Sequence, residues 1–217
     1  MNLARLSTLA FVVTVLAAGL RAQVTSVFNT SGFTGAATVI SFNSLTTDRT
    51  IITNQFSGQG VTFSGTTLYS STNSADLAFF SNPGGVIAST WNGSSPVTPF
   101  VINFTTPQGQ AGFLLEIWGQ DTINITTKLN GNVNGTVSYI NPNPANNSSF
   151  LTAVFFGVKD TVGFNSLSIT VTGSLNNQFL ANDDLRFQSI PEPGVTALLA
   201  AGLGLTALLR FRRRSAA

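Results

Sequence analysis

The chain has 217 residues, only 8% of them charged, and contains neither cysteine nor histidine. These absences exclude cysteine nucleophiles, histidine-based triads and the usual zinc sites. The formal net charge of +2 is misleading, because six of the arginines lie in the two ends of the chain. Residues 24–190 carry four basic and seven acidic residues, so their net charge is 4 − 7 = −3. The sequence therefore gives no reason to expect a nucleic-acid partner.

Residues 1–22 have the layout of a secretory signal peptide. Arg5 lies in a short amino-terminal region, residues 6–20 are almost wholly apolar, and Ala22 precedes the expected cleavage before Gln23. Signal peptidase is the partner that this layout implies, and the alternative is an uncleaved amino-terminal anchor. The layout predicts that the rest of the chain is exported.

Residues 23–188 are predicted to form one exported domain of antiparallel strands. Apolar and polar residues alternate in four stretches, at 61–64, 100–104, 122–129 and 166–172. Strands of this kind have one dry face and one solvated face, as in an antiparallel sandwich. We expect about ten to twelve short strands, because turn signals recur at the spacing typical of such folds.

The turn signals contain Gly or Pro and separate the alternating stretches. They lie at residues 58–60, 82–85, 92–93, 130–131, 134–135 and 141–144. Together with the strands they favour an all-β, antiparallel β-sandwich of jelly-roll form.

The last segment, 189–217, has three parts. Pro191-Glu192-Pro193 is followed by the uncharged residues 194–209 and then by Arg210, Arg212, Arg213 and Arg214. As a helix the uncharged part would be ~24 Å long, against ~30 Å for the hydrocarbon core of a bilayer. The arginines can snorkel to the headgroups and stop transfer. We therefore predict a transmembrane helix over 194–209, with its basic end in the cytoplasm.

This order of parts resembles the PEP-CTERM sorting tail of Gram-negative bacterial surface proteins. In that family the tail is recognised at the inner membrane by an exosortase, a membrane-embedded cysteine protease or transpeptidase. The resemblance implies that an exosortase processes the chain near Pro191-Glu192-Pro193. The protein would be anchored transiently in the inner membrane and end at the cell surface or in the extracellular matrix. The alternative is an ordinary carboxyl-terminal anchor that follows two prolines.

A second resemblance covers most of residues 37–188. Degenerate motifs there are similar to the jelly-roll domains that PEP-CTERM proteins often carry, which in turn resemble carbohydrate-binding modules in fold. The motifs lie at 41–45, 61–65, 155–158, 164–167 and 182–187. Because fold does not determine function, the resemblance raises the expectation of binding and no more.

Glu116 and Trp118 are the candidate ligand-binding residues. Alternation places both on one face of the stretch 113–118, where the ring can stack on a pyranose and the carboxylate can accept hydroxyl hydrogen bonds. Trp91 is a second candidate stacking residue. The alternative is a strand with one polar residue near a sheet edge and a tryptophan that covers the core.

The jelly-roll resemblance also implies a structural calcium ion near the first and last strands. Asp183 and Asp184, with Asn43, are its candidate ligands, because calcium takes about six to eight oxygens and adjacent carboxylates with backbone carbonyls can supply them. The alternative is that Asp184 pairs with Arg186 or caps a turn. No other cofactor is expected.

These observations predict a non-enzymatic surface protein with a structural or adhesive role in the envelope or exopolysaccharide matrix. A carbohydrate-binding module is the alternative function. A glycoside hydrolase is a remote third, because such enzymes need two carboxyl groups at a set separation and no acidic pair in the domain shows a catalytic motif.

Overall fold

The computed structural model describes residues 22–33, 37–45, 51–64, 68–70, 87–89, 99–117, 122–140, 154–172 and 180–190. Apart from Ala22 and residues 189–190, the predicted signal peptide and sorting tail lie outside the described residues. The expected turns at 82–85, 92–93 and 141–144 lie outside them as well. No helix within these ranges is long and apolar enough to cross a membrane.

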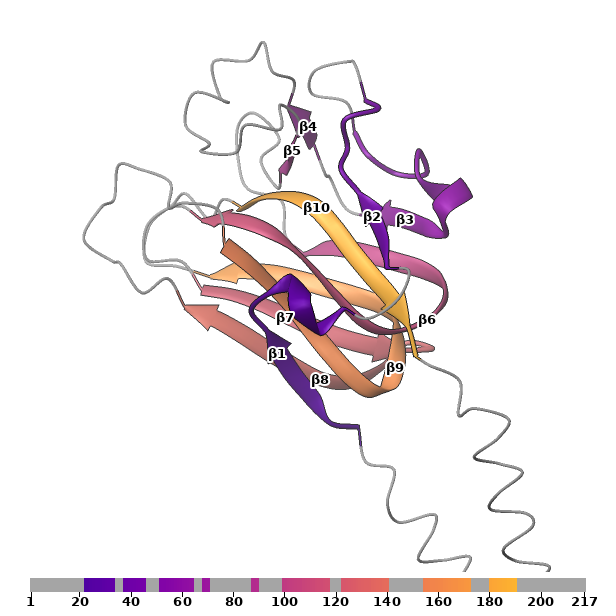
Figure 1. The fold of residues 1–217 in the computed structure, drawn as a ribbon, viewed down its shortest axis with the longest axis vertical. Helices are drawn as coiled ribbons and strands as arrows, with labels where there is room; N and C mark the ends of the chain where they lie inside the picture. Colours follow the sequence, from indigo (N-terminus) through magenta and orange to yellow (C-terminus); the bar gives the residue numbers. More distant parts are fainter. Residues whose placement is uncertain are drawn as a thin grey trace, which may run out of the picture.

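Ten strands and two short 3-10 turns make up the described part of the chain (Figure 1). The strands are β1 (Val24–Val27), β2 (Thr38–Ile40), β3 (Val61–Ser64), β4 (Leu68–Ser70), β5 (Ile87–Ser89), β6 (Phe100–Ile117), β7 (Thr122–Leu129), β8 (Asn132–Ile140), β9 (Val154–Thr172) and β10 (Leu180–Ser189). The 3-10 turns are η1 (Thr30–Gly32) and η2 (Ser57–Gln59).

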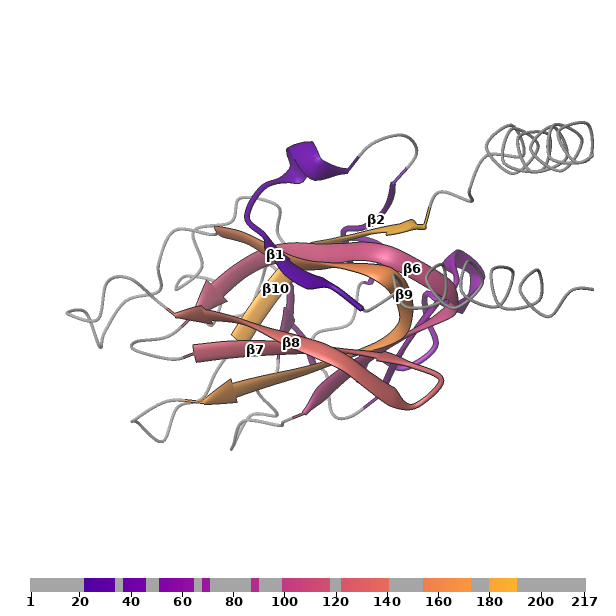
Figure 2. The same ribbon diagram turned by 90° about the horizontal axis from the view of Figure 1, so that it is seen from below.

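The strands form two layers that are joined through β6 and β9 (Figure 2). One layer contains β1, the first half of β9, the second half of β6 and β10, with β2, β5 and β4 beyond β10. The other contains β3, the first half of β6, the second half of β9, β7 and β8. Every pairing is antiparallel, so the predicted all-β antiparallel sandwich is confirmed.

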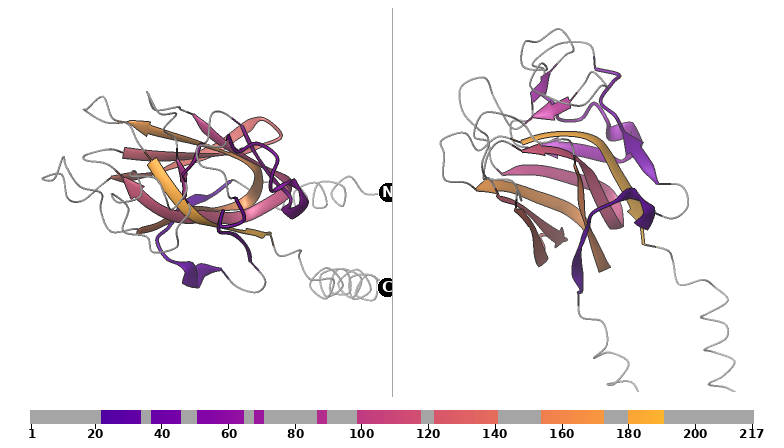
Figure 3. Two further views of the ribbon diagram at one scale, coloured as in Figure 1. Left: turned by 90° about the horizontal axis from the view of Figure 1, so that it is seen from above. Right: turned by 60° about the vertical axis from the view of Figure 1, so that its left-hand side comes forward.

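The expectation of uniformly short strands is wrong for β6 and β9, which have 18 and 19 residues. Both strands curve from one layer into the other without a turn (Figure 3). The curvature coincides with shifts in the β6–β9 register between Asn103 and Gln108 and between Gln108 and Gln110. A β-bulge bends a strand while the ladder continues on either side, so one strand serves both sheets.

The turn expected at Asn130-Gly131 is confirmed. Both residues have positive φ, 51° and 85°, as a two-residue type I′ hairpin between β7 and β8 requires. The turn expected at Asn134-Gly135 is wrong, because these residues lie within β8. Gly135 pairs with Thr127 and Val133 with Lys128, so Asn134 is the extra residue of a bulge. Gly and Asn favour a bulge as readily as a turn, and the sequence does not distinguish the two.

The inner faces carry the apolar residues that the alternation predicted. The following side chains are at most 6% exposed: Val61, Phe63, Phe100, Ile102, Phe104, Ile123, Ile125, Leu167, Ile169 and Val171. Phenylalanine rings fill much of the space between the layers, as in the stacked pair Phe63–Phe100, with centroids 5.8 Å apart. Burial of this apolar surface is the main favourable term in folding.

Two facing glycines permit the close approach of β6 and β9. Gly112 and Gly157 are paired across the two strands. A Cβ atom on Gly157 would lie 2.6 Å from the Gly112 Cα and would also overlap the Ala111 carbonyl oxygen. A Cβ atom on Gly112 would lie 2.7 Å from the Phe155 ring. The central ladder of the sandwich therefore leaves no room for a side chain at Gly157.

We expect Gly157→Ala to destabilise the protein by about 1–3 kcal/mol, because the methyl group must push backbone atoms apart. The free energy of unfolding is measured by urea denaturation, with tryptophan fluorescence as the probe of the transition. Gly58→Ala is the matched control, since a Cβ atom there has nothing within 4 Å, and its stability should stay near that of the wild type. Equal stability of the two variants would contradict the proposed close approach.

Candidate functional site

The predicted sugar platform is described only in part. Glu116 lies in β6, opposite Ala181 of β10, and the structure gives no placement for its side chain. Phe113 and Leu115 are both 0% exposed, as expected for the face of this stretch that is turned away from Glu116. Trp118 and Trp91 lie outside the described residues. Sugar stacking at these positions remains a prediction.

The candidate calcium ligands Asp183 and Asp184 lie at a bulge of β10. The Asp184 N–H donates to Asp183 Oδ1 at 2.7 Å, and Asp184 has φ 50°. Asp184 Oδ2 lies 3.7 Å from Arg186 Nη2, so the ion pair weighed as the alternative is present. Within the described ranges no group of three or more acidic side chains could hold a metal.

Asn43 follows β2, whose Ile40 pairs with Leu185 of β10, so the pairing brings the Asn43 turn toward this bulge. The neighbouring Asn182 is 2% exposed, and among the groups that the structure describes its Nδ2 amide has no hydrogen-bond partner. A cation needs oxygens rather than such a donor. Calcium binding at Asp183, Asp184 and Asn43 remains a prediction.

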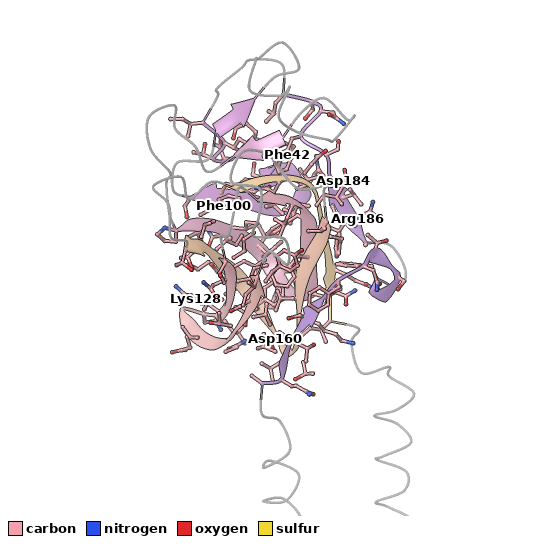
Figure 4. The ribbon with its side chains drawn as sticks, turned by 90° about the vertical axis from the view of Figure 1, so that its left-hand side faces the viewer. Phe42, Phe100, Lys128, Asp160, Asp184 and Arg186 are labelled. Carbon is pink, nitrogen blue, oxygen red and sulfur yellow. The ribbon has the colours of Figure 1, made fainter. Side chains whose placement is uncertain are left out.

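Acidic side chains lie in two separate parts of the described structure. Asp184 is near one end of the sandwich and Asp160 near the other (Figure 4). The pKa of Tyr139 is raised because burial disfavours the phenolate. Its ring packs against Phe156 with centroids 5.3 Å apart, so Tyr139 is a neutral, partly buried residue at the edge of the core.

A buried polar cluster that was not predicted from the sequence surrounds Asp160. Thr127 Oγ1 donates to Asp160 Oδ2 at 3.0 Å, and Asn134 Nδ2 donates to the same oxygen at 2.7 Å. The Val162 N–H donates to Asp160 Oδ1 at 3.1 Å. Asp160 is only 1% exposed, and these three donors compensate for the loss of water. Alternation places Thr127 on the apolar face of its strand. A hydroxyl at such a position indicates a buried polar partner, and this was the signal available in the sequence.

Both ends of the described domain meet the bend of β9, which we call the β9 corner (residues 160–164). The Gln23 N–H donates to Thr161 Oγ1 at 3.1 Å, and the Thr161 N–H donates to the Gln23 carbonyl at 3.2 Å. At the other end Ile190 packs where Gly109 and Gly163 lack a side chain, with its Cα 3.2 Å from the Cβ position of Gly109. The start of β1 and the end of β10 therefore leave the sandwich at the same end (Figure 1).

A hollow of about 230 Å³ opens beside the bend of β6. We call it the polar hollow. Three amides contribute to its lining, from Gln59, Gln108 and Gln188. The rest of the lining consists of hydroxyl side chains, one glycine and one ring, from Thr38, Thr105, Thr106, Ser189, Gly60 and Phe187. None of these residues is charged, and Gln108 and Phe187 are only 4% and 6% exposed.

The hollow exists because β6 changes partners at its bend. Before the bend β6 pairs with β3, and after it with β10. The β6–β10 register shifts between Gln188 and Ser189, so the two neighbours of β6 diverge there. The Thr105 N–H donates to the Gly60 carbonyl at 3.0 Å, and Gln110 Nε2 donates to Gln188 Oε1 at 3.1 Å. These bonds hold the two walls in place.

Comparison with known proteins supports the fold alone. A DUF4465 family protein from Bacteroides caccae ATCC 43185 superposes with a TM-score of 0.50 at 11% identity, over 72% of this chain and 100% of that chain. The cleaved adhesin domain of Lys-gingipain gives a TM-score of 0.48 at 14% identity, over 70% and 99%. The carbohydrate-binding and catalytic modules of a Clostridium thermocellum xylanase give 0.35 at 12% identity, over 67% and 28%. The last two likenesses are too weak to bear on fold or function.

No protein-family model matches the chain, and no curated protein matches it. The resemblance of the tail to the PEP-CTERM family therefore receives no support from these comparisons. The solved structure with a TM-score of 0.50 shares the β-sandwich, and at 11% identity it indicates nothing about activity.

We expect Asp160→Asn to lower the free energy of unfolding by about 1–3 kcal/mol, because one amide hydrogen must then face a buried donor. Urea denaturation measures the change. Asp184→Asn is the control, since its pair with Arg186 is about one-third exposed and a pair of this kind contributes about 0–1 kcal/mol. If Asp184→Asn lowered the free energy of unfolding as much as Asp160→Asn, the buried hydrogen bonds of Asp160 would contribute no more to stability than a partly exposed ion pair.

Proposed function

We propose that the chain is an exported, surface-sorted bacterial protein without enzymatic activity. In this proposal the β-sandwich, of jelly-roll type, has a structural or adhesive role in the envelope or exopolysaccharide matrix. The observation that carries the proposal is the shared exit of both chain ends at the β9 corner. Signal peptidase and exosortase are the processing partners that it requires.

The exit geometry suits a domain that is tethered at one end. Gln23 is hydrogen-bonded to Thr161, and Ile190 packs against Gly109 and Gly163. The predicted signal peptide ends just before Gln23, and Pro191 directly follows Ile190. Almost no free linker therefore separates the folded body from Pro191-Glu192-Pro193. A helix over 194–209 would hold the body close to the inner membrane, with the terminal arginines in the cytoplasm.

The opposite end of the sandwich would then point away from the membrane. Thr122 pairs with both Ile140 and Thr172, and Leu180 pairs with Ile117. These paired residues lie at the end of the sandwich that is remote from the β9 corner. Binding functions commonly reside on the segments that connect strands, so this end is where we expect contact with a partner.

The outer face of β7 and β8 suits contact with hydrated polysaccharide. Thr126 and Thr136 share a hydrogen bond of 2.8 Å between their hydroxyls, and Ser138 Oγ donates to Asn124 Oδ1 at 2.6 Å. These neutral hydroxyl and amide groups can both donate and accept hydrogen bonds, as sugar hydroxyls require. Lys128 lies on the same face of β7 as Asn124 and Thr126, so the face combines neutral hydrogen-bonding groups with one positive charge, which supports an adhesive role.

The sorting proposal is tested by expression in hosts with and without an exosortase. We expect the exosortase to change the apparent mass and the membrane retention of the protein, and Pro191→Ala with Pro193→Ala to abolish both changes. Replacement of Pro142 and Pro144, which form a second Pro-x-Pro sequence in the body, is the control and should leave processing intact. Identical behaviour in the two hosts would identify the tail as an ordinary anchor.

The alternative function, a carbohydrate-binding module, rests on Glu116 and on the two tryptophans. If Trp118 stacks on a sugar, Trp118→Ala should reduce binding in a polysaccharide pull-down about 5- to 150-fold, because stacking and apolar contact contribute about 1–3 kcal/mol. Trp118→Phe keeps an aromatic ring and should retain most of the binding. Equal capture of polysaccharide by wild type and Trp118→Ala would show that Trp118 does not bind the sugar. Trp91→Ala tests the second tryptophan in the same assay.

A further inference from the structure

We propose that the polar hollow beside the bend of β6 binds one unit of a neutral, hydroxyl-rich ligand, a single sugar residue. Gln108 in its wall and Glu116 belong to the same strand and are separated by about 26 Å of extended chain at ~3.3 Å per residue. The site is therefore distinct from the predicted platform at Glu116 and Trp118. It does not depend on export or sorting, because binding can be measured in the isolated protein.

Gln108 is the central observation. It is 4% exposed, and its Nε2 donates to the Thr106 carbonyl at 2.8 Å and to Thr106 Oγ1 at 3.1 Å. Both bonds use the nitrogen, and no donor in the described ranges bonds to Oε1. This atom is not among the fully buried unpaired groups, and Gln108 lines the hollow, so Oε1 is an oriented acceptor at the wall of the hollow. A buried amide that is fixed through its nitrogen is a preorganised acceptor for a hydroxyl.

The rest of the lining has the chemistry that a neutral sugar requires. The hydroxyls of Thr38 and Ser189 can each donate and accept, and the Gln59 amide does both. The Thr105 hydroxyl donates to the Gly60 carbonyl at 3.5 Å and can still accept a hydrogen bond. Phe187 adds an apolar surface for the C–H groups of a sugar ring. An anionic ligand would find no cation among the lining residues, and its charge would be desolvated without compensation.

The dimensions fit one ring rather than an enclosed chain. The volume of about 230 Å³ is below the ~300–1,000 Å³ of pockets that enclose drug-sized ligands. Because the rim residues Gln59, Thr105, Thr106 and Ser189 are exposed, a longer saccharide can leave the hollow into solvent. The Thr105–Gly60 and Gln110–Gln188 bonds fix each wall of the hollow to β6 before a ligand arrives.

The test follows the side-chain amide NMR signals of Gln59, Gln108 and Gln188 in the ¹⁵N-labelled full chain. The protein is solubilised in a zwitterionic detergent, because detergents with sugar headgroups would compete. The probes are D-glucose, D-galactose, D-mannose and N-acetylglucosamine, with D-glucuronate and glycerol as comparisons. We expect saturable shifts of these amides with at least one neutral sugar at a Kd of about 1 mM, and weaker binding of glucuronate.

Variants of the exposed rim keep the experiment independent of folding defects. Gln59→Ala combined with Thr105→Val should weaken binding at least about tenfold, because two hydrogen-bonding groups are lost. Thr25→Val, on the exposed side of β1 and outside the hollow, should bind like the wild type. Unchanged backbone signals verify that each variant is folded.

Four results would overturn the proposal. They are the absence of shifts with all four neutral sugars, tighter binding of glucuronate, equal binding of glycerol, and undiminished binding by the folded double variant. None of them bears on sorting, which is read from mass and membrane retention. Failure of the hollow and failure of the proposed function are therefore distinguishable.

Discussion

The pairing of β6 with β9 is the interaction on which the rest of the structure depends. The two strands stay paired from Phe100–Ile169 to Leu115–Val154, on both sides of their bend. Every other strand except β4 pairs with one of these two strands or with a neighbour of one, and β4 is attached through β5. Facing glycines, Gly112 and Gly157, permit the close approach at this ladder, and the inward phenylalanines pack against it. A chain without disulfides relies on such a core for its stability.

The bend of this strand pair generates the three local features of interest. At the β9 corner the chain ends converge, with Gln23 held by Thr161 and Ile190 seated over Gly163. Beside it the Asp160 carboxylate is buried with Thr127 and Asn134. On β6 the change of partner from β3 to β10 leaves the polar hollow. Bulges commonly redirect side chains and terminate pairing where a strand crosses between sheets.

Hydroxyl and amide groups predominate on two parts of the described surface. The outer β7–β8 face carries Asn124, Thr126, Thr136 and Ser138 beside Lys128, and the lining of the hollow contains no charged residue. The charged residues with described positions are few, and Asp184 with Arg186 forms a partly exposed pair. Hydroxyl and amide groups confer specificity through directional hydrogen bonds, whereas a charged surface would act through longer-range attraction.

The amino-acid sequence alone determined the all-β class, the dry faces of β3, β6, β7 and β9, and the hairpin at Asn130-Gly131. These follow from local rules, since strand alternation has a period of two residues and a type I′ turn needs positive φ at two adjacent positions. The candidate sites at Glu116, Trp118 and Trp91 and at Asp183, Asp184 and Asn43 also came from sequence, and they stay predictions.

Tertiary structure decided the continuity of β6 and β9, the bulge at Asn134, the Asp160 cluster, the hollow and the shared exit of the chain ends. Each depends on partners that are far apart along the chain, as for Thr127 and Asp160, 33 residues apart, or Gln110 and Gln188, 78 apart. Alternation specifies which face a residue takes but not which strand lies beside it. Register and bulges therefore emerge only when the sheets pack.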